Sequence, residues 1–308
     1  MRRVRYEHSG GPEVLFLEDV PVPEPGPGEL LVRTEAAGVT LPVVRKVRER
    51  GRAPVPLGGE VAGEVTATGP DVTGYRPGDR VTGLVFGHGY AEFALLHTSM
   101  ASPVPRQASA VTAVALVRSG LVALGALRAA RPAAGESALV TGAASGVGHL
   151  AVQLARIQGA SRVTAAVSDP AKGDFLRGLG ADAVVPYGAP SWGEPVDYVL
   201  DAVGGELLKP AVGALAPGGR LVAYSSGGGT IDAYDLLVGS RAVVGFQMAR
   251  VAREEPATYR AWRDELWDLY LTGRLEPVVH GEFALEDAAH AHAVIEARAN
   301  RGKVVLVP

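Results

Sequence analysis

The sequence predicts an α/β protein in which a β-rich part is followed by a doubly wound parallel sheet. Up to about residue 110, short β-rich runs are separated by Pro and Gly clusters such as PVPEPGPGE and RPGD, which is typical of an antiparallel sheet or partial barrel. From Ala110 to about Gly245, strand-like and helix-like runs alternate, which indicates parallel βαβ units. The remainder is rich in helical patterns and ends in the apolar strand KVVLVP.

Length and composition set the class of protein. With 308 residues, 47% of them hydrophobic, the chain is long enough for about two packed domains. A net charge of −3 with both signs scattered predicts no nucleic-acid interface. Arg118 and Arg128 interrupt the longest apolar region, so we expect no membrane span. The N-terminus lacks an apolar signal region and Cys is absent, so we expect a cytoplasmic protein.

Within this frame each expected element has a sequence signal. The β-rich runs of the first part are LLVRTEAAGV, EVAGEVTATG and DRVTGLVF. Parallel strands are expected at Ala138–Thr141, Arg162–Val167, Ala183–Val185, Tyr198–Asp201, Leu221–Ser225 and Ala242–Phe246. The segments ATYRAWRDELWDLYLTG and LEDAAHAHAVIEARA are expected to be helices of the C-terminal part.

A turn of small residues joins the first expected parallel strand to a helix that opens at Val147, within VTGAASGVGHLAVQLA. Such a turn lets a dinucleotide pyrophosphate approach the backbone and meet the helix N-terminus. Against the G-x-G-x-x-G template, however, only the last of the six residues 143–148, Gly148, is in register. By itself the motif fits equally well a tight turn in any α/β protein.

Eight segments spread along the chain support the interpretation of this turn, because they occur in the same order as in a known family. They are AAGVT (36–40), GGEVAGEVTATGPDVTGYRPGDRV (58–81), GYAEFALL (89–96), TGAASGVGHLAVQLAR (141–156), GADAVVPY (180–187), DYVLDAVGG (197–205), LAPGGRLVAY (215–224) and FALEDAAHAHAVIEARANRGKVVLV (283–307). In these the chain resembles the zinc-independent quinone oxidoreductase branch of the medium-chain dehydrogenase/reductase superfamily. The resemblance implies a Rossmann-type dinucleotide-binding domain, residues 113–248, inserted in a β-rich GroES-like substrate domain, residues 1–112 and 249–308.

The sequence also departs from the metal-dependent cousins of that family. These cousins place a Cys after the AAG strand and a His in a Gly-His-Glu step, where this chain has Val39-Thr40 and Gly58-Gly59-Glu60. Without any Cys, a tetrahedral zinc site cannot be assembled on that plan. His290 and His292 point to different helix faces, and we interpret them as two partly exposed histidines. We therefore expect no metal, and hydride transfer to an electrophilic acceptor rather than alcohol oxidation.

The residues after the second parallel strand predict NADPH as the cofactor. Asp169 could bind a ribose hydroxyl as in NAD sites, but the following Pro170 favours it as a helix N-cap. Ser168 and Lys172 supply a hydroxyl and a cation for the 2′-phosphate, and the family uses Ser, Lys and Tyr at the places of Ser168, Lys172 and Tyr187. Alternatively, Lys172 is a solvated helix lysine and Tyr187 a packing residue at a strand end.

The remaining cofactor contacts follow from topology and resemblance. The nicotinamide is expected across the carboxyl ends of the later strands, where Phe246 could equally be a core aromatic. An Arg before the last strand reaches the adenosine phosphate in the family, although Arg298 could equally be a surface residue. The further expected cofactor-binding residues are Ala144, Ser145, Gly146, Val147, Val203, Gly204, Ser225, Phe246 and Arg298.

The acceptor pocket is less well specified. Where the family carries Asn, Asp and Tyr, this chain has Thr40, Val43 and Arg45. Arg45 offers a forked donor if it faces inward, or else belongs to a solvated basic helix face. His88 is a candidate proton donor for an enone, and no catalytic residue is assigned. We expect metal-free hydride transfer from NADPH to a small-molecule quinone or α,β-unsaturated ketone; the alternative is an NADPH-binding structural or sensing protein with little turnover.

The segment SRAVVGFQM predicts an apolar edge strand in the nucleotide domain. A bare edge of this kind is prone to aggregation, and pairing with its own copy about a two-fold axis would satisfy it. The resembling family commonly assembles in this way. We therefore expect a homodimer formed through the nucleotide domains.

Overall fold

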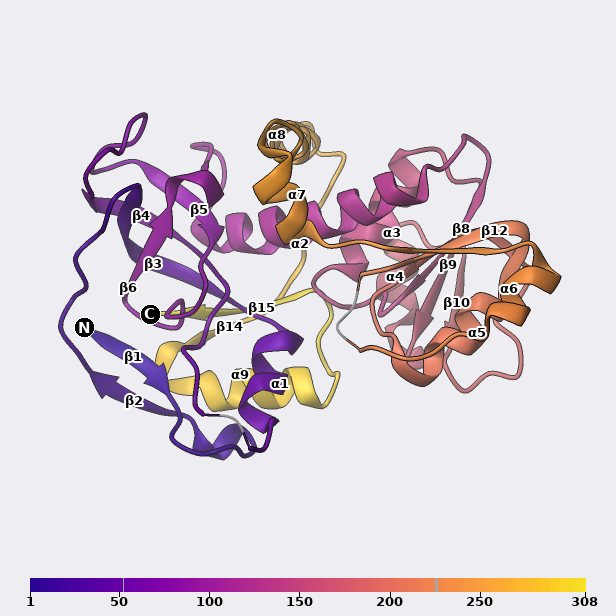
Figure 1. Cartoon of the computed structure of the whole chain (residues 1–308), viewed down its shortest axis with the longest axis horizontal. Helices are drawn as coiled ribbons and strands as arrows, with labels where there is room; N and C mark the ends of the chain where they lie inside the picture. Colours follow the sequence, from indigo (N-terminus) through magenta and orange to yellow (C-terminus); the bar gives the residue numbers. More distant parts are fainter. Residues whose placement is uncertain (52, 225–226) are drawn as a thin grey trace. The chain divides into compact units, whose positions relative to one another are not determined.

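The computed structural model describes residues 1–51, 53–224 and 227–308, which form two compact units (Figure 1). The first unit contains Met1–Arg118 and Pro277–Pro308, and the second contains Ser119–Glu276. Residues 249–276 were expected in the β-rich domain, but they lie in the second unit. The reason is side-chain packing against the helix at residues 119–130, where the Arg128 guanidinium bonds the Glu265 carboxylate at 2.8 Å.

The first unit is built on a seven-stranded sheet in the order β14-β15-β3-β4-β5-β7, with β6 paired to β3. Apart from β14 and β15, which run parallel, the neighbouring strands are antiparallel, and β1 and β2 form a separate antiparallel pair. Its strands are β1 (Arg2–Arg5), β2 (Phe16–Asp19), β3 (Glu29–Val39), β4 (Glu60–Thr68), β5 (Arg80–Leu84), β6 (Phe93–His97), β7 (Ala101–Pro103), β14 (Val279–Ala284) and β15 (Lys303–Val307).

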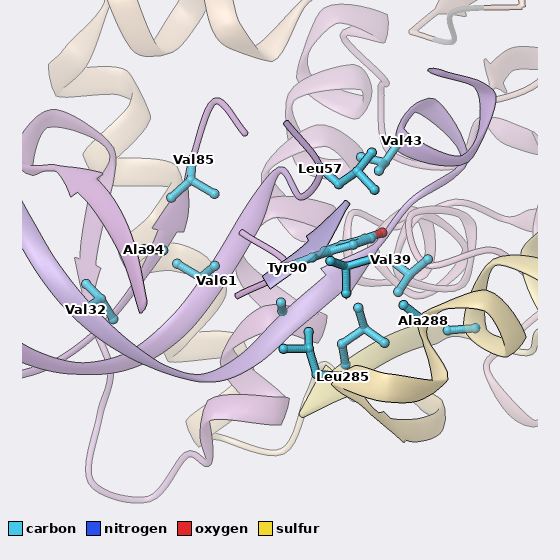
Figure 2. Close-up of a cluster of buried hydrophobic side chains, with 14 of the residues drawn as sticks. Val32, Val39, Val43, Leu57, Val61, Val85, Tyr90, Ala94, Leu285 and Ala288 are labelled. Atoms are coloured by element: carbon cyan, nitrogen blue, oxygen red, sulfur yellow. The ribbon is translucent and has the colours of Figure 1, made fainter. Parts of the chain in front are cut away.

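Two helices cover this sheet. Helix α1 (Leu41–Arg48) buries Val43, Val44 and Val47, and α9 (Ala288–Glu296) lies beside it (Figure 1). Figure 2 shows the resulting core, in which the buried ring of Tyr90 lies among apolar side chains from the strands and from the start of α9. The short 3-10 helices of this unit are η1 (Pro12–Val14), η2 (Thr98–Met100) and η5 (Leu285–Asp287).

The second unit contains a six-stranded, wholly parallel sheet in the order β10-β9-β8-β11-β12-β13. The strands are β8 (Ser137–Thr141), β9 (Arg162–Val167), β10 (Ala183–Pro186), β11 (Val196–Asp201), β12 (Leu215–Ala223) and β13 (Ala242–Gly245). All six expected strands are confirmed, with ends shifted by up to six residues, as at the start of β12. The expected fold class, a Rossmann-type parallel sheet together with a β-rich unit, is confirmed as well.

Sheet order decides where a ligand site forms. The direction of winding reverses between β8 and β11, so right-handed crossovers place α3 and α4 on the face opposite α5. Ligands of such sheets bind outside the carboxyl ends of the strands at this reversal. The helices are α3 (Gly148–Ile157), α4 (Gly173–Gly178), α5 (Leu208–Gly213), α6 (Ala233–Gly239), α7 (Met248–Glu254) and α8 (Pro256–Leu271), with η3 (Pro170–Lys172) and η4 (Gly205–Leu207).

Helix α2 (Ala110–Ala130) is unusually apolar. By length and composition alone it could cross a membrane. The charges at Arg118 and Arg128 had led us to expect no such helix. However, 78% of the tested window is buried inside the protein, and the buried core helix of a globular domain passes the same test. Leu116, Leu121, Leu124 and Leu127 are among its fully buried side chains.

Candidate cofactor-binding site

A hydrogen-bonded pair of side chains joins the two strands at the reversal of the sheet. Thr141 ends β8 and Asp201 ends β11, and both are fully buried. The Thr141 hydroxyl donates to Asp201 Oδ1 at 2.6 Å and accepts from the amide of Ala202 at 2.9 Å. Asp201 Oδ2 in turn accepts from the amide of Gly204 at 2.9 Å. The two loops that follow β8 and β11 are therefore tied to each other.

The turn after β8 can hold an anion with its backbone. A Cβ at Gly148 would overlap the carbonyl oxygen of Gly142, so only glycine permits this close passage of helix and strand. The Ser145 hydroxyl accepts from the Gly148 amide at 3.0 Å. Across residues 1–51, 53–224 and 227–308, no hydrogen bond engages the amides of Gly146 and Val147. These donors lie at the N-terminus of the ten-residue helix α3, where the helix dipole favours a phosphate.

The expected turn residues Ala144, Ser145, Gly146 and Val147 are thus brought together immediately before α3. The arrangement fits a pyrophosphate, because the side chains are small and amide donors without partners precede the helix. Their role toward a cofactor remains a prediction.

The end of β9 confirms one expectation and overturns another. Asp169 Oδ1 accepts from the Ala171 amide at 2.9 Å, so Asp169 is the predicted N-cap, here of η3. The Lys172 side chain is only 5% exposed, so the alternative of a solvated helix lysine is wrong. Lys172 ends η3 directly before α4.

Tyr187 lies at the end of β10, as either of its two expected roles requires. Its hydroxyl accepts a hydrogen bond from the Gly142 amide at 2.8 Å, which connects it to the turn after β8. The ring also packs beside Trp192, with 6.1 Å between centroids. Tyr187 therefore has a packing role and, in addition, borders the turn after β8.

The loops after β11 and β12 meet through glycine backbone. Gly204 adopts φ 71°, and a Cβ there would lie 2.8 Å from the carbonyl oxygen of Gly228. The Val203 amide donates to Asp201 Oδ1 at 3.3 Å. The Tyr224 hydroxyl is buried with no hydrogen-bond partner in the described part of the chain, and burial raises its pKa. Ser225, another expected contact, lies outside the described residues.

Phe246, at the end of β13, contacts two helices. A Cβ on Gly125 of α2 would overlap its ring, and its centroid lies 6.4 Å from that of Trp262 on α8. The ring is half-buried. It therefore packs as an aromatic of this unit, and the expected contact with a nicotinamide stays a prediction.

The expected acceptor residues belong to the first unit. Thr40 is buried and is the N-cap residue of α1, Val43 is buried on that helix, and Arg45 is exposed. His88 is exposed with φ 58°, and its Nδ1 lies 3.3 Å from Arg3 Nη1. Partial burial, with a contribution from Arg3, lowers the pKa of His88. Arg298 is exposed with φ 52° after the end of α9.

Two histidines of α9 have different surroundings. His290 is exposed, whereas His292 is fully buried with Nε2 3.2 Å from the Tyr90 hydroxyl. The expectation that both are partly exposed is therefore wrong for His292, since its face of α9 points into the core. In the described part of the chain, no group of three His, Cys, Asp or Glu could hold a metal ion.

Sequence reasoning missed the Thr141 and Asp201 pair. Both residues were placed at strand ends, but a signal for their contact would have required the strand order, in which β8 and β11 are neighbours although 60 residues apart in sequence. A buried polar residue at each of two carboxyl strand ends was the available hint.

Comparisons with known proteins follow the same division of the chain. The family model described as alcohol dehydrogenase GroES-like domain matches residues 26–106, and the model described as zinc-binding dehydrogenase matches residues 146–265. A quinone oxidoreductase from Pseudomonas aeruginosa is 31% identical over 100% of this chain and 99% of its own length. A 2-haloacrylate reductase from Burkholderia is 29% identical over 97% of this chain and 96% of its own.

A solved structure shares the whole fold. A mycobacterial protein, solved as a complex with NADPH, superimposes with a TM-score of 0.93 at 31% identity, and the match covers 100% of both chains. The cofactor expected from the residues after β9 is therefore the one bound in this relative.

Proposed function

The chain belongs to the zinc-independent quinone oxidoreductase branch of the medium-chain dehydrogenase/reductase superfamily, and from this we propose that it is an NADPH-dependent reductase of quinones or α,β-unsaturated ketones. Bound NADPH would supply a hydride to the acceptor. The observation that carries the proposal is the turn after β8, where small residues and two unbonded amides precede α3.

Different residues of the second unit bind the pyrophosphate and the 2′-phosphate of NADPH. The amides of Gly146 and Val147 hold the pyrophosphate, while the missing side chain of Gly148 lets α3 begin close to β8. Ser168 and Lys172 bind the 2′-phosphate, with Tyr187 nearby through its bond to the turn. Because a phosphate is a stronger partner than a hydroxyl for a cation, Lys172 favours NADPH over NADH.

Reduction of the acceptor needs little further chemistry from side chains. A quinone or enone is already electrophilic, so proximity and orientation are the main requirements, and we propose that no metal takes part. An enone also needs a proton at its α-carbon. Water and His88, whose exposed side chain lies beside Arg3, are the two proton sources that we propose for this step. Thr40 and Val43 remain the proposed pocket residues.

The proposal includes a homodimer formed through the second unit. Strand β13 is an edge of the parallel sheet, and the neighbouring helix α6 exposes Tyr234, Leu237 and Val238. An uncovered edge beside apolar side chains favours association. Pairing of two copies about a two-fold axis would cover both features.

The test measures NADPH consumption by purified protein with quinones and α,β-unsaturated ketones, with and without a chelator. We expect turnover that the chelator leaves unchanged. Tight NADPH binding without consumption of any acceptor would instead support a structural or sensing role.

A pair of glycine variants connects this activity to the turn. Gly148→Ala introduces a Cβ that overlaps Gly142, whereas a Cβ at Gly178, which ends α4, meets no atom within 4 Å. Fluorescence titration should therefore show weakened NADPH binding for Gly148→Ala and near-normal binding for Gly178→Ala. Equal affinity in the two variants would remove the turn from the cofactor site.

A further inference from the structure

A buried ion pair connects two strands of the first unit. Glu60 begins β4 and Lys303 begins β15, and each side chain is only 2% exposed. The Lys303 ammonium contacts Glu60 Oε1. Gly38 on β3 makes room for the pair, because a Cβ there would overlap the Glu60 side chain. The carboxylate is therefore held in place by packing as well as by its partner.

Arg118, on α2, is the second cation beside this carboxylate. Its Nη1 lies 3.9 Å from Glu60 Oε1, which is beyond hydrogen-bond distance. Only 26% of its side chain is exposed, and within the described residues its guanidinium makes no hydrogen bond. A guanidinium carries five N–H donors and keeps its charge at all ordinary pH values. Arg118 thus presents unused donors on a largely buried permanent cation.

The arrangement of charges explains why the ion pair between Glu60 and Arg118 is long, at 3.9 Å. Lys303 already pairs with the carboxylate, and Glu60 Oε2 is buried without a hydrogen-bond partner among the described residues. Burial lowers the pKa of Lys303, Glu60 opposes this effect, and repulsion by Arg118 adds to it. One carboxylate thus faces two basic groups. An external carboxylate would supply the hydrogen-bond acceptors that the guanidinium lacks, because its ion pair with Glu60 at 3.9 Å is too long for a hydrogen bond.

We propose that Arg118 binds a carboxylate carried by the hydride acceptor, so that the preferred substrates are acidic enones or acidic quinones. The inference rests on the proposed function and deepens it. Guanidinium and carboxylate match each other in a planar, bidentate geometry. Arg45, expected in the sequence as the candidate for this role, is exposed on α1, whereas only 26% of the Arg118 side chain is exposed.

The test compares two enones of one scaffold, 4-carboxybenzylideneacetone and benzylideneacetone. Both are assayed by NADPH oxidation with the wild type and with Arg118→Gln, Arg118→Lys and Arg33→Gln. Arg33 is the matched control, because it is a half-exposed cation of the same unit that pairs with Glu64 at 3.0 Å. Calorimetric titration of each enone in the presence of NADP+ adds a measure of binding that does not depend on turnover.

Arg118→Gln should raise KM and Kd for the carboxylated enone about 10- to 100-fold, the range of a lost charge-assisted hydrogen bond, and leave the neutral enone nearly unchanged. Arg118→Lys should fall in between, and Arg33→Gln should resemble the wild type. Equal effects of Arg118→Gln on both enones, or none, would overturn the role of Arg118. Reduction of neither enone nor any quinone by the wild type would overturn the proposed function, while the titrations would still decide whether Arg118 binds the carboxylate.

Discussion

Acidification should destabilise the first unit through His292 on α9. The side chain is 1% exposed, and its Nε2 faces the Tyr90 hydroxyl at 3.2 Å (Figure 2 shows the position of Tyr90). Burial lowers its pKa from 6.5 to about 4, with Glu296 opposing the shift. The folded protein therefore keeps this imidazole neutral over a range of pH in which the unfolded chain protonates it.

The sign and size of the effect follow from this difference. Above pH 6.5 both states carry neutral His292, and its contribution to stability is fully present. As the pH falls from 6.5 toward about 4, the unfolded state binds more protons and stability declines. At about 1.4 kcal/mol per pH unit the full loss is about 3.4 kcal/mol, of which about 2 kcal/mol is reached at pH 5. The pKa values of Glu18, Glu92 and Glu296 are lowered from 4.5, so these carboxyls add to the decline mainly below pH 5, and a comparison of pH 7 with pH 5 reports chiefly on His292.

The assay is urea unfolding at pH 7 and pH 5 for the wild type, His292→Gln and His290→Gln. His290 is an exposed histidine of the same helix and serves as the matched control. His292→Gln should abolish about 2 kcal/mol of the pH-dependent loss, whatever its effect on stability at pH 7, and His290→Gln should preserve that loss. An equal decline in the wild type and His292→Gln would refute the assignment to His292.

Further predictions concern the cofactor, the buried ion pair and assembly. Lys172→Ala should weaken NADPH binding by about 1–3 kcal/mol and leave the affinity for NADH nearly unchanged. Titration of the variant with both cofactors checks this, with Lys209→Ala at an exposed lysine as the control, and equal losses of affinity for the two cofactors would contradict it. Glu60→Gln should lower the free energy of urea unfolding by about 3–5 kcal/mol, because Lys303 loses its buried partner, and the added substitution Lys303→Met should restore most of that stability. If the double variant regains no stability, the pair does not act as a unit. Leu237→Asp, at a side chain 72% exposed, should yield monomers in light scattering, whereas a monomeric wild type would exclude the dimer.

Local patterns predicted the parts of this fold that local interactions determine. The strands of the parallel sheet were found because apolar runs alternate with helical segments, and the cap at Asp169 because Pro170 follows it. Expected strand ends shifted where pairing extends beyond the apolar run, as in β12, which begins at Leu215 rather than Leu221. The periodicity of apolar residues and the cap signal at Pro170 therefore predicted these elements.

Contacts between distant segments could not be predicted in this way. Burial of His292 depends on which face of α9 meets Tyr90, 202 residues away. The position of α8 in the second unit depends on its packing against α2, as in the Arg128–Glu265 pair. Neither contact has a local signal, because a helical pattern fixes the spacing of side chains but not the element that they meet.

The role of Arg118 is the clearest example of a feature that the sequence does not predict. In the sequence this residue only interrupts an apolar run, and its sign alone says nothing about a ligand. The structure brings it to a carboxylate that Lys303 has already engaged, so that among the described residues its donors make no hydrogen bond. A cofactor turn can be recognised from small residues because backbone amides do the binding. Recognition of an acceptor by Arg118 instead depends on three residues from three separate elements, and only the fold places them together.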